Sequence, residues 1–320
     1  MNMKIVFMGT PDFAEESLKK IYEAGHNILA VVTNQDKPKG RGMKLTYSPV
    51  KEFAMEKNLR IEQPQKVRNN EEFINEIKSL NPDVICVVAY GKILPKEILE
   101  IPKYGCINVH ASLLPKYRGA APIQWSVLNG DKTTGVTTMY MDVGMDTGDM
   151  ILKKEAQIGE SETTGELWDR LKVIGADLLV ETLKRLENGT APRIKQGDDY
   201  TLAPMLTKDM AKIDWNKKTA IEIKNLVRGL NPIMGAYTIL NGKKIKFWKV
   251  DLAKENEITI ENLDFLGNGV VLIANSKDGL YIKAKQGIIK VLEIQGENSK
   301  RMSINDYLRG NKIEEFEVFE

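Results

Sequence analysis

The sequence predicts an α/β protein in two parts, a mostly parallel sheet covered by helices and then a small β-barrel or sandwich. Two observations carry this prediction. Until about residue 187, short runs rich in apolar and β-branched residues alternate with helical patterns, which is typical of a parallel sheet buried on both faces. Beyond residue 208, short strand-like runs follow one another at turn signals such as Asn241-Gly242 and Asp278-Gly279, which is typical of a small barrel or sandwich.

In the first part, strands are expected at residues 4–8, 28–33, 83–89, 106–110 and 136–141. Helical patterns lie between the earlier strands, at residues 11–24, 50–57 and 71–80. A longer helix at residues 164–187 carries apolar side chains three and four positions apart, and Asn188-Gly189 is a stop signal at its end.

Residues 190–208 form the predicted linker, because they contain Pro192, Gly197 and Pro204 and show no sustained periodicity. The second part begins with a helical pattern at residues 219–230. Its strands are expected at residues 236–240, 244–250, 269–274, 279–284 and 288–294. We therefore expect one domain at residues 1–189 and a second at residues 209–320.

Length and charge limit the function classes. A chain of 320 residues is long enough for two domains. Its 46 Lys and Arg against 44 Asp and Glu give a net charge of +2, which excludes a protein held on nucleic acid by general basicity alone. Any RNA contact is therefore expected to be local.

The apolar runs and the cysteines indicate the compartment. The longest apolar run, near residues 84–89, is far shorter than the roughly 20 residues of a membrane span, and the first residues lead into a strand rather than a secretory signal. Cys86 and Cys106 each lie in an apolar strand-like run, which predicts buried, reduced thiols. We expect a monomer in the cytoplasm.

Asn108 and His110 are the first candidates for chemistry. His110 ends the strand expected at residues 106–110, and strand alternation points both side chains to the same face. The carboxyl ends of strands in an open α/β sheet border the ligand crevice. An amide can donate a hydrogen bond there, and an imidazole can exchange a proton near neutral pH. The alternative is a buried histidine satisfied by the backbone.

A third candidate lies in the loop at residues 142–149, where three carboxylates stand among glycines. The loop lacks the ligand pattern of an EF-hand, and solvated turn residues are the simpler interpretation of Asp142 and Asp149. Asp146 has a glycine two residues to either side, which allows close backbone approach. We therefore expect Asp146 beside His110, where it would orient the imidazole and stabilise its cation.

Two motifs make the sequence similar to a known family. Residues 108–119 read Asn-Val-His-Ala-Ser-Leu-Leu-Pro-Lys-Tyr-Arg-Gly, and residues 142–148 read Asp-Val-Gly-Met-Asp-Thr-Gly. With these motifs the chain resembles the folate-dependent formyltransferases, whose active site is an Asn, a His and an Asp in this order. Further runs at residues 8–13, 87–95 and 119–124 are most similar to the family members that act on tRNA, and the similarity covers nearly the whole chain.

The resemblance implies a Rossmann-like catalytic domain and an OB-like C-terminal barrel. It implies that the protein passes a formyl group from 10-formyltetrahydrofolate to the α-amine of methionine on initiator methionyl-tRNA, for translation initiation. The implied catalytic residues are Asn108, His110 and Asp146, and the implied folate contacts are Ser112, Leu113, Leu114 and Pro115.

The chemistry fits these residue types. Formyl transfer to an amine passes through a tetrahedral intermediate with an oxyanion, so the site needs a preorganised hydrogen-bond donor and a group that manages protons. Asn108 suits the first role. His110 suits two roles, a second oxyanion donor or a proton carrier, and Asp146 would set its tautomer. The scheme requires neither a metal nor a covalent intermediate.

Two basic stretches are candidate tRNA contacts. Residues 37–51 hold five basic residues and no acid, and residues 243–249 alternate lysines with two aromatic residues. A solvated loop and a half-buried strand are the simpler interpretations. For the first stretch, however, the resemblance implies a basic insertion that reaches the acceptor end of tRNA; for the second, RNA contact and a structural strand are equally favoured. The candidate residues are Arg41, Lys39, Lys44 and Lys246.

Three other functions stay open at this point. A formyltransferase for an amino sugar or a purine-pathway amine would keep the three catalytic residues but would lack the basic stretch. A hydrolase of formyl-folate would use the same residues with water as acceptor. An inactive RNA-binding protein would have no need of Asn108, His110 and Asp146 together.

Overall fold

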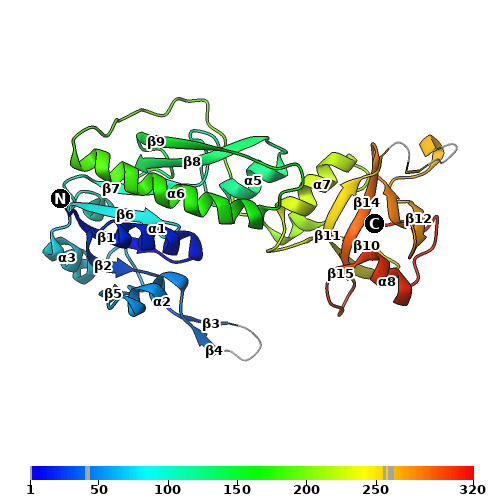
Figure 1. Ribbon diagram of the computed structural model, residues 1–320, viewed down its shortest axis with the longest axis horizontal. Helices are drawn as coiled ribbons and strands as arrows, with labels where there is room; N and C mark the ends of the chain where they lie inside the picture. The colour runs from blue at the N-terminus through cyan, green and yellow to red at the C-terminus, as the bar shows by residue number, and fades with distance from the viewer. Residues whose placement is uncertain (1, 40–43, 255–256, 259–262) are drawn as a thin grey trace. The chain divides into compact units, whose positions relative to one another are not determined.

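The computed structural model describes residues 2–39, 44–254, 257–258 and 263–320 (Figure 1). The chain divides into two compact units that interleave along the sequence. The first comprises Met1–Pro122, Thr133–Gln157 and Trp168–Pro204, and the second Ile123–Lys132, Ile158–Leu167 and Met205–Glu320. The sequence predicts domains at residues 1–189 and 209–320, joined by a linker at residues 190–208. These limits are continuous along the chain, unlike the two compact units, and they stay a prediction.

Within the described residues, the first unit is built on a seven-stranded sheet with the order β5-β2-β1-β6-β7-β8-β9. The strands from β5 to β7 pair in parallel, whereas β8 pairs antiparallel with both β7 and β9. The predicted, mostly parallel sheet is therefore confirmed. Its strands are β1 (Lys4–Gly9), β2 (Asn27–Val32), β5 (Ile61–Glu62), β6 (Val84–Val88), β7 (Cys106–His110), β8 (Thr133–Tyr140) and β9 (Met150–Gln157).

Helices cover both faces of this sheet. On one face, Val6 and Met8 of β1 share a core cluster with Phe73 of α3. On the other face, α6 lies so close that a Cβ on Gly175 would stand 3.0 Å from a methyl group of Val109. The helices at the first unit are α1 (Asp12–Glu23), α2 (Pro49–Glu56), α3 (Glu71–Leu80), α4 (Lys96–Leu99) and α6 (Thr164–Glu187), which begins in the second unit.

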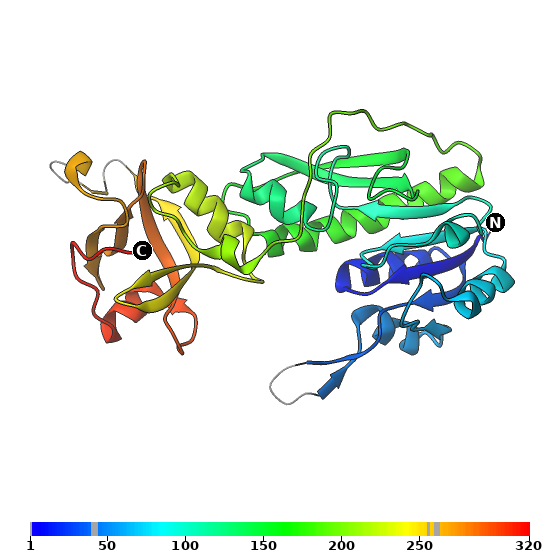
Figure 2. The same cartoon turned by 180° about the vertical axis from the view of Figure 1, so that it is seen from behind.

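The first basic stretch forms a hairpin of its own (Figure 2). Strands β3 (Lys37–Lys39) and β4 (Lys44–Thr46) pair antiparallel as a separate two-stranded sheet, with Lys39 opposite Lys44. For these two lysines the structure describes only the backbone. Arg41 lies outside the described residues.

The second unit holds an antiparallel sheet with the order β10-β11-β14-β13-β12, and β15 pairs with β14. The last residues of the chain connect its two end strands. Glu320 exchanges backbone hydrogen bonds with Ile239 of β10, while Phe319 N donates to Gly269 O beside β12 at 2.9 Å. These bonds close the sheet, so the predicted barrel is confirmed. Its strands are β10 (Ala236–Leu240), β11 (Lys243–Leu252), β12 (Val271–Asn275), β13 (Gly279–Lys283), β14 (Ile288–Gln295) and β15 (Met302–Ser303).

Aromatic packing fills the barrel. The rings of Trp215, Phe247 and Phe319 contact one another with centroids 5.8–6.3 Å apart, a range typical of stabilising edge-to-face and tilted pairs. Phe247 is fully buried and is not available for base stacking. The helices of this unit are α5 (Pro122–Leu128), α7 (Ala220–Gly229) and α8 (Ile304–Gly310), with short 3-10 turns η1 (Lys208–Ala211) and η2 (Leu263–Phe265).

Candidate active site

Strand β7 places Asn108 and His110 on one face at the carboxyl end of the parallel strands. Asn108 pairs with Val87 of β6 on one side and with Met139 of β8 on the other, so its backbone position is fixed from both sides. Its side chain is half-buried and, among the described residues, has no hydrogen-bond partner. The amide of Asn108 is therefore free to donate to a ligand.

His110 is buried and faces a protein oxygen with each ring nitrogen. Its Nε2 donates to the carbonyl oxygen of Tyr117 at 2.9 Å, and its Nδ1 lies 3.7 Å from Oδ2 of Asp146. A protonated ring can donate toward both oxygens. Each ring nitrogen must lose its present contact before it can form a hydrogen bond with a substrate.

Asp146 stands in a strained backbone conformation, with φ at 55°. This left-handed region costs a non-glycine residue free energy unless surrounding contacts hold it there. Its Oδ2 accepts a hydrogen bond from Gly119 N at 2.8 Å, which is shorter than its distance to His110. The structure thus places Asp146 near His110, on the strand that also carries Asn108. The catalytic roles of these three residues stay a prediction.

The expected folate loop is held from β8 and β9. Thr137 Oγ1 donates to Ser112 O at 2.7 Å and accepts from Leu114 N at 3.1 Å, while Lys153 Nζ donates to Leu114 O. The Ser112 hydroxyl donates to Lys116 O at 2.6 Å, and the Leu114 side chain is buried. A folate contact by these two residues would run through their backbone.

Leu113 and Pro115 alternate with those buried residues and are only half-buried. Their side chains are the part of the 112–115 stretch that can reach a ligand. The assignment of this stretch to folate stays a prediction.

Sequence reasoning missed the segment at residues 193–203, which bonds to both loops of the site. Arg118 N donates to Thr201 O at 2.8 Å, and Ala203 N donates to Arg118 O at 2.7 Å. At the start of β9, directly after the other loop, Ile194 and Met150 exchange backbone hydrogen bonds of 2.8 and 2.9 Å. Since these partners lie far apart in sequence, no local pattern could have signalled the contact.

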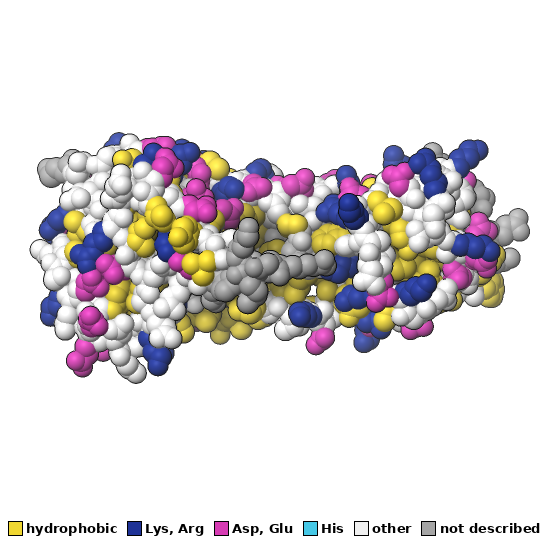
Figure 3. Space-filling model, turned by 90° about the horizontal axis from the view of Figure 1, so that it is seen from below, with side chains coloured by type: hydrophobic (Ala, Val, Ile, Leu, Met, Phe, Trp, Pro, Cys, Tyr) yellow, Lys and Arg dark blue, Asp and Glu magenta, His cyan; other side chains and the backbone are white. Residues whose placement is uncertain are grey.

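Lys246 is hydrogen-bonded within the second unit. Its Nζ donates to Met234 O at 2.8 Å, and burial together with the neighbouring Lys244 lowers the pKa of its ammonium group. On the face drawn in Figure 3, Lys and Arg side chains lie interspersed with Asp and Glu. A tRNA contact by Lys246 stays a prediction, and it would have to replace the bond to Met234.

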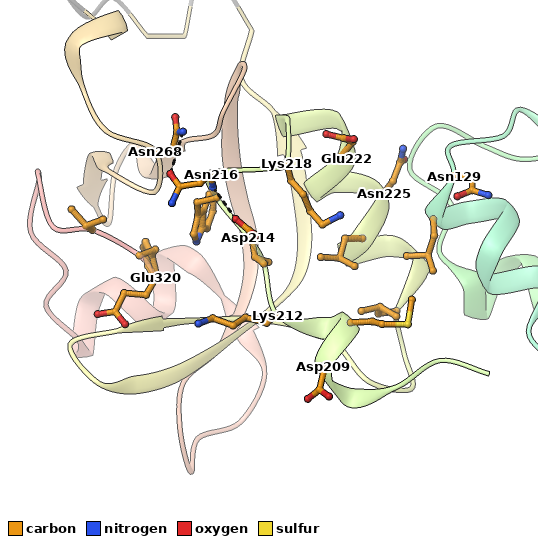
Figure 4. Close-up of a pocket in the computed structure, with 18 of the residues that line it drawn as sticks. Asn129, Asp209, Lys212, Asp214, Asn216, Lys218, Glu222, Asn225, Asn268 and Glu320 are labelled. Atoms are coloured by element: carbon orange, nitrogen blue, oxygen red, sulfur yellow. Dashed lines mark hydrogen bonds between the residues drawn. The ribbon is translucent and has the colours of Figure 1, made fainter. Parts of the chain in front are cut away.

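A separate cavity of about 1000 Å³ lies in the second unit (Figure 4). None of the predicted catalytic residues lines it. Its lining mixes lysines with carboxylates and amides, and Asn268 Nδ2 donates to Asn216 Oδ1 across its rim at 3.4 Å. Labelled residues in the view include Lys212, Asp214, Lys218, Glu222 and Asn225.

The described ranges hold no cluster of metal ligands and no membrane-spanning helix. There, His, Cys, Asp and Glu form no group of three or more that could hold a metal ion. The described helices include none that is both long and apolar enough to cross a membrane. Cys86 and Cys106 are free and buried, as predicted.

Comparison with protein families shows the class of protein to which this fold belongs. The chain matches the formyl transferase family over residues 3–183 and the formyl transferase C-terminal domain family over residues 205–312. The chain belongs to the formyl transferase family, and the sequence-based assignment is confirmed.

Full-length relatives carry a more particular name. The methionyl-tRNA formyltransferase of Caldanaerobacter subterraneus is 52% identical over 98% of both chains. That of Clostridioides difficile is 53% identical, again over 98% of both chains.

Solved structures agree in fold. An N-formyltransferase from Helicobacter canadensis, in complex with folinic acid and dTDP-3-aminofucose, has a TM-score of 0.63 at 22% identity, covering 93% of this chain and 100% of its own. HypX from Aquifex aeolicus in complex with tetrahydrofolic acid has a TM-score of 0.64 at 14% identity, covering 96% of this chain and 47% of its own.

Proposed function

We propose that this protein transfers a formyl group from 10-formyltetrahydrofolate to the α-amine of methionine on initiator methionyl-tRNA. The observation that carries the proposal is identity of 52% to a methionyl-tRNA formyltransferase over 98% of both chains. The assembly of Asn108, His110 and Asp146 at one edge of the sheet supports it, because these are the groups that the reaction needs.

In the reaction, the amine nitrogen attacks the formyl carbon, and a tetrahedral intermediate forms whose oxygen carries the negative charge. The bond from that carbon to N10 of the folate then breaks, and N10 takes up a proton while the amine loses one. Asn108 is the donor for the oxyanion, since its amide has no described protein partner and a preorganised donor stabilises charge that develops in the transition state.

His110 and Asp146 manage the proton. His110 releases its contact with Tyr117 or Asp146 and either carries the proton from amine to N10 or donates to the oxyanion. Asp146 faces Nδ1 of the ring with its Oδ2 and so orients the imidazole for this transfer.

Binding of the two substrates is assigned to different parts of the chain. Leu113, Pro115 and the backbone of residues 112–115 contact the folate. The β3–β4 hairpin contacts the tRNA near its acceptor end through Lys39, Arg41 and Lys44, and the barrel adds contacts that include Lys246. Free, buried cysteines suit the reducing cytoplasm, where we place the protein as a monomer with domains at residues 1–189 and 209–320.

The test offers one donor to several acceptors. Purified protein is incubated with 10-formyltetrahydrofolate and, separately, with initiator methionyl-tRNA, uncharged initiator tRNA, a dTDP-linked amino sugar or buffer. We expect N-formylmethionine only with the charged tRNA. Formylation of the sugar, or release of formate in buffer at the same rate, would refute the proposal.

A further inference from the structure

Gln196 connects the two loops that contact His110. Its Nε2 donates to the carbonyl oxygens of Asp146 and Gly148, both at 2.8 Å, and its Oε1 accepts from Arg118 Nε at 2.9 Å. A primary amide has two N–H donors and one carbonyl acceptor. The Gln196 side chain therefore uses both donors and its acceptor on the catalytic loops.

The two carbonyls held by Gln196 flank the strained turn of the site. Asp146 has φ at 55°, and the neighbouring turn is so tight that a Cβ on Gly148 would stand 1.8 Å from Tyr140 O. A left-handed aspartate persists only where its surroundings determine its conformation. Gln196 supplies two hydrogen bonds for that purpose, and the direction of the Asp146 carboxylate depends on the same backbone.

The other end of Gln196 reaches the loop that carries the second partner of His110. Arg118 follows Tyr117, whose carbonyl accepts from His110 Nε2. Arg118 Cζ also lies 4.5 Å from the centroid of the Tyr200 ring, and Tyr117 N donates to Thr201 Oγ1 at 2.9 Å. Residues 196–201 thus help to fix the positions of the two protein oxygens that face the imidazole, Tyr117 O and Asp146 Oδ2.

Packing does not explain this side chain. Gln196 is half-buried in a run whose other members from Arg193 to Tyr200 are exposed, and both polar atoms of its side chain are hydrogen-bonded. What it loses on substitution is therefore its hydrogen bonds.

We propose that Gln196 is a positioning residue for formyl transfer, which fixes the Asp146 carboxylate and the Tyr117 carbonyl around His110. The inference rests on the proposed function, because the activity it modulates is formylation of methionyl-tRNA. Gln196 touches neither substrate in this account, so its loss should lower kcat and leave both KM values nearly unchanged. Misplacing a catalytic group by about 1 Å can cost on the order of 100-fold in rate, and we expect a loss of about 10- to 100-fold.

The experiment compares Gln196→Met with Gln157→Met in the full chain. Methionine keeps the length of the side chain but removes all three hydrogen bonds. Gln157 ends β9 on the exposed surface, and its Oε1 lies 3.3 Å from Thr133 Oγ1, away from both loops. A third variant, Gln196→Glu, keeps the acceptor for Arg118 but turns a carboxylate toward the two carbonyls, so it should lose at least as much kcat as the methionine variant.

Two readouts separate positioning from a general loss of structure. The melting temperature and kcat per folded molecule are measured for each variant. The chain has only 2 histidines, so the ring signals of His110 and His26 are resolved by NMR, and His26 serves as an internal reference. In Gln196→Met the His110 signal should move while that of His26 stays, and the Gln157→Met protein should match wild type in both readouts.

The results distinguish failure of the proposed function from failure of the positioning role of Gln196. If the wild-type protein does not formylate methionyl-tRNA, the proposed function fails. If wild type is active and Gln196→Met or Gln196→Glu keeps its kcat, or if the loss lies in KM or only in the melting temperature, the positioning role of Gln196 is wrong.

Discussion

Oδ2 of Asp146 accepts a hydrogen bond from Gly119 N at 2.8 Å and lies 3.7 Å from His110 Nδ1. One carboxylate oxygen therefore faces both the end of β7 and the loop that follows it. Because Gly119 N is a fixed backbone donor, the position of this oxygen relative to the imidazole is set before any substrate binds. Preorganisation of this kind is what lets a charged group assist a reaction without reorganising.

Loss of either β7 side chain should slow transfer strongly without unfolding the protein. His110→Ala and Asn108→Ala should each lower kcat by about 100-fold or more, as the loss of an oxyanion donor or an acid–base group usually does. Steady-state formylation of methionyl-tRNA measures this effect. Near-wild-type turnover in either folded variant, checked by circular dichroism, would remove that residue from the mechanism.

The turn after Asp146 should tolerate no added methyl group. In Gly148→Ala, the new Cβ would stand 1.8 Å from Tyr140 O, so the loop must shift and carry Asp146 with it. We expect kcat to fall by about 10-fold or more, on the same basis as other small misplacements in active sites.

Gly197→Ala is the matched control, because a Cβ there meets nothing within 4 Å. Its kcat should equal that of wild type. Equal kcat in both glycine variants would show that the geometry of residues 142–149 does not matter for the reaction.

Substitution of Lys153 should weaken the binding of folate and leave the binding of tRNA unchanged. Its ammonium donates to Leu114 O in the loop expected to bind folate, and burial lowers the pKa of this group. Lys153→Met should loosen the loop and raise the KM for 10-formyltetrahydrofolate several-fold, with the KM for methionyl-tRNA unchanged.

The neighbouring Lys154 is exposed and provides the control. Lys154→Met should leave the folate KM as in wild type. A rise in the KM for tRNA, or the same rise in both lysine variants, would argue for a general charge effect instead.

Several features of this structure could be predicted from local sequence. The sheet follows from apolar strand runs, and Asn108 and His110 share a face because strands alternate. Asp146 could be placed near them because a glycine-rich loop after a strand can approach closely. The strands predicted at residues 4–8 and 106–110 agree with β1 and β7 to within one residue.

Other features depend on contacts that no local pattern signals. Gln196 contacts Asp146, which lies 50 residues earlier in the sequence, and Arg118, which lies 78 residues earlier. The barrel closes through Phe319 and Glu320, whose backbone bonds go to residues some 50 and 80 positions earlier. The alternation of lysines and aromatics at residues 243–249 favoured RNA contact and a structural strand equally, and only the structure shows that Phe247 lies in the core.

The two thiols should resist modification in the folded state. Burial raises the pKa of the Cys106 thiol to about 12 and raises that of Cys86 further. Since only the thiolate reacts readily, a disulfide reagent at pH 8 should label neither cysteine until denaturant is added. Rapid labelling of native protein would contradict the burial of this core.

His26 should make stability depend on pH. Burial lowers its pKa in the folded protein below the ordinary value, so the unfolded chain takes up the proton first. The free energy of unfolding should therefore fall as the pH drops below about 6.5, the unfolded value, and stay high above it. Urea unfolding of wild type and His26→Gln between pH 5 and pH 8 measures this effect, and the variant should lose that part of the dependence. Identical pH profiles would contradict it.

Whether Asn108 and His110 catalyse formyl transfer to methionyl-tRNA can be measured in a single-turnover reaction with a radiolabelled formyl group. Excess enzyme is mixed with labelled 10-formyltetrahydrofolate and initiator methionyl-tRNA, and the amino acid is released from the tRNA and separated. We expect the label to appear in N-formylmethionine at a rate that falls by about 100-fold or more in His110→Ala and Asn108→Ala. Label recovered as formate while methionine stays unmodified would contradict it.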